Sequence, residues 1–487
     1  MVDDPSTRGL ASRTLRGMYW AYGSFVGLRL MAVIVTAILA RLLTPRDFGL
    51  VAIATTIMVF LEVWQGVGIS QALVIASEDE VNDQANAAFT LSVAVGIALT
   101  LLAAALGPAA AAFFHQPQLI LIMPVLGSTF LILNLSSTHN ALAMRSIDFR
   151  SRTAAELLDG LARGVCGVAL AFAGAGVWSL ILGYVAGNIA LTLTLWRLVP
   201  WRPRRVQDRR HFRHILRFGG YLTGVGVMTA FLGQFDNLVV GRVLGETQLG
   251  FYSIATSLSA LAIFSIAVVA GQVLFPAFAQ LDSDALRRGV LTSFNYLSVV
   301  VFPLAAFLIV LAEPITITIY GPHWHGAVAA VQVLALLYAT APINMVCGNA
   351  FFSRGKARLV FLLGVPQAAA LVVGSLLLAP YGIVAVAWVQ ATIGITAQAV
   401  TLIIVQRMFK LTIPSLLKAF LPPLFASAVL AGVLLGLREF VTAAWPEMIG
   451  GAVLGGGVYL ALLHVLSPEL LPGIIRMVFA RRSEAPA

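Results

Sequence analysis

The chain has 487 residues, of which 59% are hydrophobic and only 11% charged, and its mean hydropathy is +0.92. Soluble domains are about 45–50% apolar and about 25% charged, so a water-soluble protein of this length is excluded. The apolar residues lie in runs of about 20 or more, which is the length that crosses a bilayer core as a helix. Both cysteines, Cys166 and Cys347, lie inside such runs, which excludes a disulfide framework. The sequence therefore predicts an all-α polytopic membrane protein.

Fourteen membrane-spanning helices are expected, separated by short turns with proline and glycine. We place them at 18–43, 49–75, 86–113, 119–143, 153–174, 177–199, 218–243, 248–275, 289–312, 326–350, 359–379, 382–405, 415–437 and 446–466. These spans leave no room for a soluble domain. The first apolar stretch is too long for a cleaved signal peptide, so we expect the N-terminus to be retained.

The basic residues predict the orientation of the helices, because cytoplasmic loops carry the excess of lysine and arginine. With a cytoplasmic N-terminus, most of the 31 basic residues fall on the inner side. The outer side then holds only Arg41, Arg46, Arg242 and Arg438. The even number of spans places both termini in the cytoplasm. This bias explains the net charge of +10 without any nucleic acid, and the basic segment 200–217 is expected to contact anionic inner-leaflet lipids.

An internal repeat relates two parts of the chain. At an offset of 201 residues the segment 39–56 lies over 240–257, and both segments are hairpins between spans in the same orientation. The identical positions are Arg41/Arg242, Leu43/Leu244, Gly49/Gly250, Ile53/Ile254, Ala54/Ala255 and Thr55/Thr256. We therefore expect two six-helix lobes, at 1–217 and 218–410, followed by two helices and a tail at 411–487. Such repeats are typical of alternating-access transporters, in which the substrate passes between the halves.

Four motifs then occur in a fixed order along the chain. They are Leu39-Ala-Arg-Leu-Leu-Thr-Pro-Arg-Asp-Phe-Gly49, the segment 234–255 with Gln234-Phe-Asp-Asn237 at its start, Val273-Leu-Phe-Pro-Ala-Phe-Ala-Gln-Leu281, and Ile319-Tyr-Gly-Pro-His-Trp-His-Gly-Ala327. The set resembles the bacterial polysaccharide transporters, the Wzx-type lipid-linked oligosaccharide flippases of the multidrug/oligosaccharidyl-lipid/polysaccharide (MOP) superfamily. It is most similar to the subgroup that serves exopolysaccharides such as colanic acid, and the resemblance runs from about residue 15 to about residue 405.

The resemblance implies a flippase in the bacterial inner membrane. Its implied substrate is an undecaprenyl-pyrophosphate-linked oligosaccharide repeat, which it would move to the periplasmic leaflet for exopolysaccharide or lipopolysaccharide synthesis. A polysaccharide polymerase and export machinery are the implied protein partners. The identity of the glycan does not follow from the resemblance.

Charged side chains inside spans are candidate functional residues, because a charge at mid-bilayer costs about 2.5–3.5 kcal/mol on insertion scales. Arg29 and Glu62 lie at the same predicted depth on adjacent antiparallel helices, and Arg163 follows Asp159 by one helical turn. In one interpretation each arginine forms a structural ion pair. In the other, each arginine lines a central cavity.

Substrate charge favours the second interpretation, since the arginine fork matches the geometry of a phosphate group. Burial in the bilayer favours the neutral form of a carboxyl group, so Glu62 is the candidate proton carrier. The candidate residues are Arg29 and Arg163 for the pyrophosphate, Glu62, Asp159 and Asp236 for ion coupling or ion pairing, and Arg41 and Arg242 for the outer gate or the substrate headgroup.

Motifs of enzymes are absent from the sequence, including the serine-nucleophile, phosphate-loop and His-Glu-x-x-His patterns. His323 and His325 flank Trp324 without a third ligand nearby, so no metal or other cofactor is expected, and coupling to protons or sodium is left open. Two other functions stay open. One is a multidrug-type small-molecule or cation antiporter of the same superfamily. The other is a membrane-embedded glycosyltransferase or polysaccharide polymerase, which needs a larger outer loop than 313–325.

Overall fold

The computed structural model describes residues 27–65, 73, 81–146, 148–204, 210–440 and 444–468. The first part of the first expected span, the centre of the basic segment 200–217 and the C-terminal tail lie outside the described residues. Every regular element in the described part is a helix. The chain divides into two compact units, unit 1 up to Gly250 and unit 2 from Phe251. The expected lobe boundaries at 217/218 and 410/411 stay predictions.

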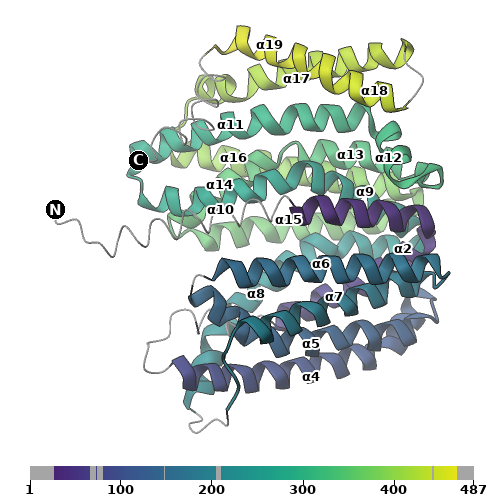
Figure 1. Cartoon of the computed structure of the whole chain (residues 1–487). Helices are drawn as coiled ribbons and strands as arrows, with labels where there is room; N and C mark the ends of the chain where they lie inside the picture. Colours follow the sequence, from purple (N-terminus) through teal and green to yellow (C-terminus); the bar gives the residue numbers. More distant parts are fainter. Residues whose placement is uncertain are drawn as a thin grey trace, which may run out of the picture. The chain divides into compact units, whose positions relative to one another are not determined.

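Unit 1 is a bundle of long helices (Figure 1). In chain order they are a helix at 27–42, α2 (Pro45–Gln65), α4 (Val81–Phe114), α5 (Leu119–Arg145), α6 (Phe149–Phe172), α7 (Val177–Leu198), α8 (Arg210–Val243) and the start of α9 (Glu246–Ser259). α4 packs along α5, α6 packs along α7, and α2 packs against α8. Small residues allow these approaches, as where Gly127 of α5 lies against Ala103 of α4.

Helix 27–42 packs on α6 through a stripe of glycines. The contacts pair each glycine with one apolar side chain, namely Gly160 with Met31, Gly164 with Val35 and Gly167 with Leu39. A β carbon at Gly164 would lie 2.6 Å from Cγ2 of Val35, so a larger residue does not fit there. Because the paired residue numbers rise together, the two helices are parallel, and Arg29 lies at the level of Leu158 on α6.

Unit 2 continues the all-helical pattern with shorter and interrupted helices. Its elements are the rest of α9, η1 (Ala260–Phe264), α10 (Ser265–Gln280), α11 (Ser283–Val310), α12 (Ala312–Tyr320), η2 (Pro322–Ala327), α13 (Val328–Tyr338), α14 (Ala341–Ser353), α15 (Ala357–Leu378), η3 (Ala379–Tyr381), α16 (Ile383–Met408), α17 (Ile413–Phe440), α18 (Ala444–Gly450), η4 (Gly451–Gly455) and α19 (Gly456–Leu466). α10 packs on α14, α11 on α17 and α13 on α16.

The core of unit 2 is apolar. Phe278, Phe294 and Phe351 are fully buried in one cluster that α10, α11 and α14 share with residues of α16 and α17. A buried aromatic side chain buries about 150–250 Å² of surface, so these three side chains make a large contribution to the packing of the core. One polar contact joins α19 to α11, where the Tyr459 hydroxyl donates to the carbonyl oxygen of Val299 at 2.7 Å.

Three expected features of unit 2 differ from the structure. The expected span 326–350 breaks at Thr340, because Pro342 has no N–H to donate and begins a new helix in α14. The expected final span contains one π-helical turn at Gly451–Gly455. This stretch is rich in glycine, whose backbone adopts non-α conformations easily. The expected outer loop 313–325 is helical, since α12 and η2 cover most of it.

Eleven helices in the described residues are long and apolar enough to cross a membrane. The other expected spans fall on helix 27–42, α6 and α8, which are not among the eleven. α6 carries Glu156, Asp159 and Arg163 within its length, and these charges lower its apolar character. The number fourteen therefore stays a prediction, whereas the multi-pass helical architecture is confirmed.

Candidate functional site

A capping box fixes the hairpin between helix 27–42 and α2. The Asp47 carboxylate oxygen Oδ2 accepts hydrogen bonds from the Thr44 backbone N–H at 3.0 Å and from the Thr44 hydroxyl at 2.7 Å. In return, the Asp47 N–H donates to Oγ1 of Thr44 at 3.3 Å. Pro45 occupies the first helical position, where its missing N–H costs nothing. Arg46 and Asp47 are thereby held in the first turn of α2.

The two repeat-related hairpins contact each other through a pair of glycines. A β carbon on Gly49 would collide with the carbonyl oxygen of Glu246, and a β carbon on Gly250 would collide with the carbonyl oxygen of Pro45. The 201-residue offset relates Gly49 to Gly250 and Pro45 to Glu246, so the two contacts are equivalent. The sequence repeat thus corresponds to a local two-fold relation at this point of unit 1.

Polar side chains surround these glycines. The carboxylate of Glu246 pairs with Nε of Arg46 at 3.1 Å and accepts a hydrogen bond from the Gln116 amide at 2.6 Å. We call Gly49, Gly250, Arg46, Glu246 and Gln116 the hairpin clasp. It ties the start of α2, the end of α4 and the start of α9 at one end of unit 1.

Of the two predicted gate residues, Arg242 lies beside the hairpin clasp. Its guanidinium is 2.9 Å from Nδ1 of His115 and 5.3 Å from the ring centroid of Phe113, at the end of α4. Arg41, its repeat counterpart, is exposed on the last turn of helix 27–42. The ion pair that joins the two hairpins uses Arg46 and Glu246, and the gate role of Arg41 and Arg242 stays a prediction.

Arg163, one of the two arginines predicted to bind the pyrophosphate, lies at the packed interface of α6 and α7. Its Nη2 is 3.2 Å from both carboxylate oxygens of Asp159, and its guanidinium carbon is 4.3 Å above the ring centroid of Tyr184. Gly187 makes room for the pair, because a β carbon there would collide with Oδ1 of Asp159. We call Arg163, Asp159, Tyr184 and Gly187 the arginine site.

Arg163 has N–H donors that its contact with Asp159 does not use. A guanidinium has five N–H donors in a fixed fork, and only Nη2 contacts Asp159. Nε is buried without a hydrogen-bond partner, and Nη1 has none among the described residues. The side chain is 34% exposed, so a ligand can reach it. The arginine site is therefore an oriented cation with unused donors in the middle of a helix pair.

Arg29 and Glu62 do not pair with each other in the structure. Both side chains are exposed, Arg29 on helix 27–42 and Glu62 on the last turns of α2. Among the described residues Glu62 has no ion-pair partner. Because Arg29 lies at the level of Leu158, it is within one residue of the depth of Asp159 on the neighbouring helix.

The predicted residue Asp236 lies in a polar cluster between α8 and α2. Asp236 is buried, and its Oδ1 accepts from the Asn237 backbone N–H at 2.9 Å. The side-chain oxygen of Gln234 accepts from the Asn237 amide at 2.8 Å and from the Thr56 hydroxyl at 3.3 Å. The signature segment 234–237 thus contributes hydrogen bonds that hold α8 against α2.

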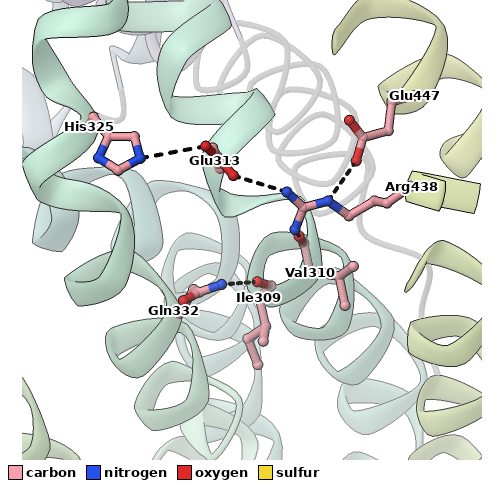
Figure 2. A network of polar contacts seen from close by, with 7 residues as sticks. All are labelled: Ile309, Val310, Glu313, His325, Gln332, Arg438 and Glu447. Carbon is pink, nitrogen blue, oxygen red and sulfur yellow. Dashed lines mark hydrogen bonds and ion pairs between the residues drawn. The ribbon is translucent and has the colours of Figure 1, made fainter. Parts of the chain in front are cut away.

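Unit 2 contains a different arginine cluster, shown in Figure 2. Arg438 of α17 pairs through Nη2 with Glu313 of α12 at 2.9 Å and through Nε with Glu447 of α18 at 3.2 Å. Its Nη1 donates to the carbonyl oxygen of Val310 at 3.3 Å, and His325 lies 3.5 Å from Glu313 on the other side. This cluster joins the ends of α11, α12, α17 and α18.

Comparison with known proteins assigns the family. A family model described as polysaccharide biosynthesis protein matches residues 38–329, which is more than half of the chain. The chain belongs to the polysaccharide biosynthesis protein family. The resemblance seen in the sequence motifs is thereby confirmed.

Two relatives match nearly the full length of the chain. The teichuronic acid biosynthesis protein TuaB of Bacillus subtilis is 24% identical over 96% of this chain and 98% of the relative. The succinoglycan biosynthesis transport protein ExoT of Rhizobium meliloti is 28% identical over 98% of this chain and 97% of the relative.

Solved structures show the same fold. A lipid II flippase, MurJ, in its inward closed conformation matches with a TM-score of 0.80 at 14% identity, over 93% of this chain and all of that one. An inward-facing multidrug resistance transporter of the MATE family, in the MOP superfamily, matches with a TM-score of 0.64 at 16% identity, over 79% of this chain and 96% of that one. The family member described here therefore has the fold of the MOP superfamily transporters, as predicted.

Sequence reasoning missed several residues of these clusters. Glu246, Gln116 and Arg46 of the hairpin clasp were not candidates, although Glu246 is the repeat counterpart of the helix-starting Pro45. Glu313 and Glu447 were missed because a carboxylate at a helix end is usually exposed to water and needs no partner in the protein. Among the described residues, no group of three His, Cys, Asp or Glu side chains is placed to hold a metal ion.

Proposed function

We propose that this family member is a flippase that moves undecaprenyl-pyrophosphate-linked oligosaccharide repeats from the cytoplasmic to the periplasmic leaflet by alternating access. The supporting observation is full-length similarity to a succinoglycan biosynthesis transport protein, together with a fold shared with a lipid II flippase. One relative is named for transport in polysaccharide synthesis and the other for flipping a lipid. A lipid-linked saccharide combines the two.

The arginine site is the proposed contact for the pyrophosphate. The hydrogen bonds of Arg163 to Asp159 use Nη2, which leaves Nη1 for a ligand, and charge-assisted hydrogen bonds to phosphate oxygens are strong in a low-dielectric cavity. Asp159 orients the guanidinium while using one of its three nitrogens. Arg29, at the depth of Asp159, is proposed as the second cation for the same headgroup.

Coupling to an ion gradient is proposed to involve Glu62. Its carboxylate has no ion-pair partner among the described residues, so no fixed cation holds it in the deprotonated form, and it is free to take up a proton. Asp159 is held by Arg163, and Asp236 is held among backbone and amide groups, so both are better suited to structural roles. The driving ion is a proton in this proposal.

The hairpin clasp, with Arg41 and Arg242 nearby, is the proposed outer gate. Alternating access in repeat-built transporters is largely rocking of one repeat against the other. The repeat-related contacts of Gly49 and Gly250 leave no space at this point, so the gate has to separate here when the outer side opens.

The proposed setting is the bacterial inner membrane, with both termini in the cytoplasm. The outward hairpins then carry few basic residues, as the positive-inside rule requires. The basic segment 200–217 is proposed to contact anionic inner-leaflet lipids, and a polysaccharide polymerase with its export machinery is the proposed downstream partner.

A small-molecule antiporter is the second candidate, because the fold is shared with a multidrug resistance transporter. The family description and both full-length relatives concern polysaccharide biosynthesis, which favours the saccharide substrate. A glycosyltransferase or polymerase is disfavoured because the segment 313–325 forms packed helices around Trp324, a fully buried side chain.

Deleting the gene in its host tests the proposal. We expect surface polysaccharide to disappear while completed lipid-linked repeats accumulate in the inner leaflet. Accumulation of short, unfinished lipid-linked saccharides would show a glycosyltransferase instead. Unchanged polysaccharide with increased sensitivity to cationic drugs would show the antiporter.

The two-fold relation of the hairpin clasp has a test of its own. Gly49→Ala and Gly250→Ala should lower the free energy of unfolding by similar amounts, about 1–3 kcal/mol, because each β carbon meets a backbone carbonyl. Gly233→Ala in α8 is the matched control, since nothing lies within 4 Å of its β carbon. Markedly unequal effects at Gly49 and Gly250, measured by thermal unfolding in detergent, would contradict the two-fold relation.

A further inference from the structure

A cavity of about 290 Å³ opens at the end of unit 1 that carries the hairpin clasp. Three turns meet around it: the start of α2, the start of α5 and the α6–α7 turn. Asp47, Gln118 and Trp178 supply its polar and aromatic lining, while Leu121 and Ile122 of α5 supply an apolar wall. Neither the pyrophosphate contact nor the gate proposed above uses this cavity.

The α6–α7 turn holds Trp178 at the cavity. Gly174 and Gly176 have positive φ values of +77° and +55°, which side-chain-bearing residues rarely adopt, so the tight turn depends on glycine. The turn passes close to α2, because a β carbon on Gly176 would be 3.5 Å from Oδ1 of Asp47. Trp178 follows in the first turn of α7 and lines the same cavity as Asp47.

The lining has unused hydrogen-bonding capacity of both signs. The capping box occupies Oδ2 of Asp47, whereas Oδ1 accepts no hydrogen bond from any described residue. The Gln118 amide and the Trp178 indole N–H have no protein partner among the described residues either. The lining residues therefore offer donors from Gln118 and Trp178, and acceptors from Gln118 and the charged Asp47.

These groups match the chemistry of a sugar ring. Hydroxyl groups can donate to a carboxylate and accept from an amide, and the apolar C–H face of a pyranose can lie on an indole, which has an apolar body and a polar edge. The volume is just below the range of about 300–1,000 Å³ for small-molecule pockets, so a single ring fits better than a chain.

Charge narrows the ligand class further. Asp47 is the charged residue among those that line the cavity, so a carboxylate or phosphate on the ligand would meet a like charge. Arg46, the adjacent cation, is directed to Glu246 in the hairpin clasp. A neutral or amino sugar is therefore favoured over a uronic acid or a phosphate.

We propose that Asp47, Gln118 and Trp178 form a subsite for one neutral pyranose at the clasp end of unit 1. Its physiological ligand, a sugar of the lipid-linked repeat, rests on the proposed function. The subsite would hold the saccharide beside the outer gate while the lipid headgroup moves.

Saturation-transfer NMR on the purified full-length protein tests this subsite. The probes are methyl α-D-glucopyranoside, methyl β-D-galactopyranoside, glucuronate and inorganic phosphate. We expect the neutral glycosides to bind at millimolar concentration, and Trp178→Leu to weaken their binding about tenfold or more through loss of the aromatic face. Gln118→Ala should weaken binding about threefold, since one neutral hydrogen bond is lost.

Two further variants keep the test decisive. Trp388→Leu on α16 removes another half-exposed tryptophan and should leave glycoside binding unchanged. Asp47→Asn, checked for folding by thermal unfolding, should raise the relative binding of glucuronate by removing the like charge. Equal binding of phosphate and the neutral glycosides, or equal binding by Trp178→Leu and the wild type, would overturn the subsite.

The subsite and the proposed function fail separately. If the reconstituted protein flips a lipid-linked saccharide but binds no glycoside, the subsite is wrong and the function stands. If it binds neutral glycosides through Trp178 but flips no lipid, the subsite stands and the function is wrong.

Discussion

Arg163 in unit 1 and Arg438 in unit 2 are both paired with carboxylates, yet they use their donors differently. All three nitrogens of Arg438 lie against protein oxygens: Nη1 and Nη2 donate hydrogen bonds to the carbonyl oxygen of Val310 and to Glu313, and Nε forms an ion pair with Glu447 at 3.2 Å. Arg163 engages one nitrogen with Asp159 and leaves Nε buried without a hydrogen-bond partner. The side chains are almost equally exposed, at 35% and 34%, so burial does not distinguish them.

The difference indicates separate roles. A guanidinium whose donors are satisfied by the protein joins helices, whereas one with donors in reserve can bind an anion. Their positions agree with this division, because Arg438 lies at helix ends while Arg163 lies in the middle of α6. The unused hydrogen-bond donors of a paired arginine therefore distinguish an arginine that binds an anion from one that only joins helices.

The largest expected effect follows from Arg163→Ala. Loss of charge-assisted hydrogen bonds to the substrate should lower surface polysaccharide at least about tenfold. Arg163→Lys should restore transport in part, since lysine keeps the charge without the fork. The free energy of unfolding should fall by less than about 1 kcal/mol, because the pair is partly exposed, at 34% for Arg163 and 19% for Asp159.

Exchanging the two residues of this pair separates binding from ion pairing. Arg163→Asp combined with Asp159→Arg keeps an ion pair but moves the cation by one helical turn. We expect normal folding and impaired transport. Normal transport by the exchanged pair would make Arg163 a structural residue like Arg438.

Arg438→Ala should have the opposite profile. It leaves Glu447, which is 6% exposed, without its cation, so the free energy of unfolding should fall by about 1–3 kcal/mol. Transport per folded molecule should stay within about twofold of the wild type. Both quantities come from thermal unfolding and from transport normalised to the amount of folded protein. A transport defect in fully folded protein would remove the distinction between the two arginines.

Tyr184 provides a smaller test within the arginine site. Its ring lies 4.3 Å from the Arg163 guanidinium, and a cation–π contact of this kind contributes about 0.5–1 kcal/mol. Tyr184→Leu should therefore lower transport about two- to fivefold, whereas Tyr184→Phe should have little effect because it keeps the ring. Equal effects of Leu and Phe would show that the hydroxyl, rather than the ring, matters.

The smallest expected effect concerns His325 beside Arg438. His325 is 69% exposed and 3.5 Å from Glu313, so this exposed contact contributes only about 0–1 kcal/mol to stability. His325→Ala should therefore lower the free energy of unfolding by less than about 1 kcal/mol, measured by thermal unfolding. A loss as large as that of Arg438→Ala would show that His325 is an essential part of the cluster.

The sequence predicted the architecture better than the site. Apolar runs predict membrane helices whatever their neighbours, and the Gly49 and Gly250 repeat located a contact that the structure shows in detail. The sequence also indicated the pair of Arg163 and Asp159, because charged residues inside a span are rare and these two lie one helical turn apart. Which donors of Arg163 remain unused depends on the packing of α6 against α7, and one sequence does not specify that packing.

Residues at helix ends were the hardest to predict. Glu313, Glu447 and Glu246 have ordinary solvated explanations in the sequence, and only the fold brings each of them to an arginine. The Asp47, Gln118 and Trp178 cavity is a similar case, because its residues come from three turns far apart in the chain. The glycines at 174 and 176 were the one local signal for that turn.

Flipping in proteoliposomes is the most direct test of the central claim. The protein is reconstituted with a fluorescent undecaprenyl-pyrophosphate disaccharide, and its movement between leaflets is followed by quenching from outside. We predict that wild-type protein and Arg438→Ala equilibrate the lipid between leaflets, and that Arg163→Ala is slower by at least about tenfold. Movement no faster than in protein-free vesicles, or equal rates for Arg163→Ala and the wild type, would contradict the account.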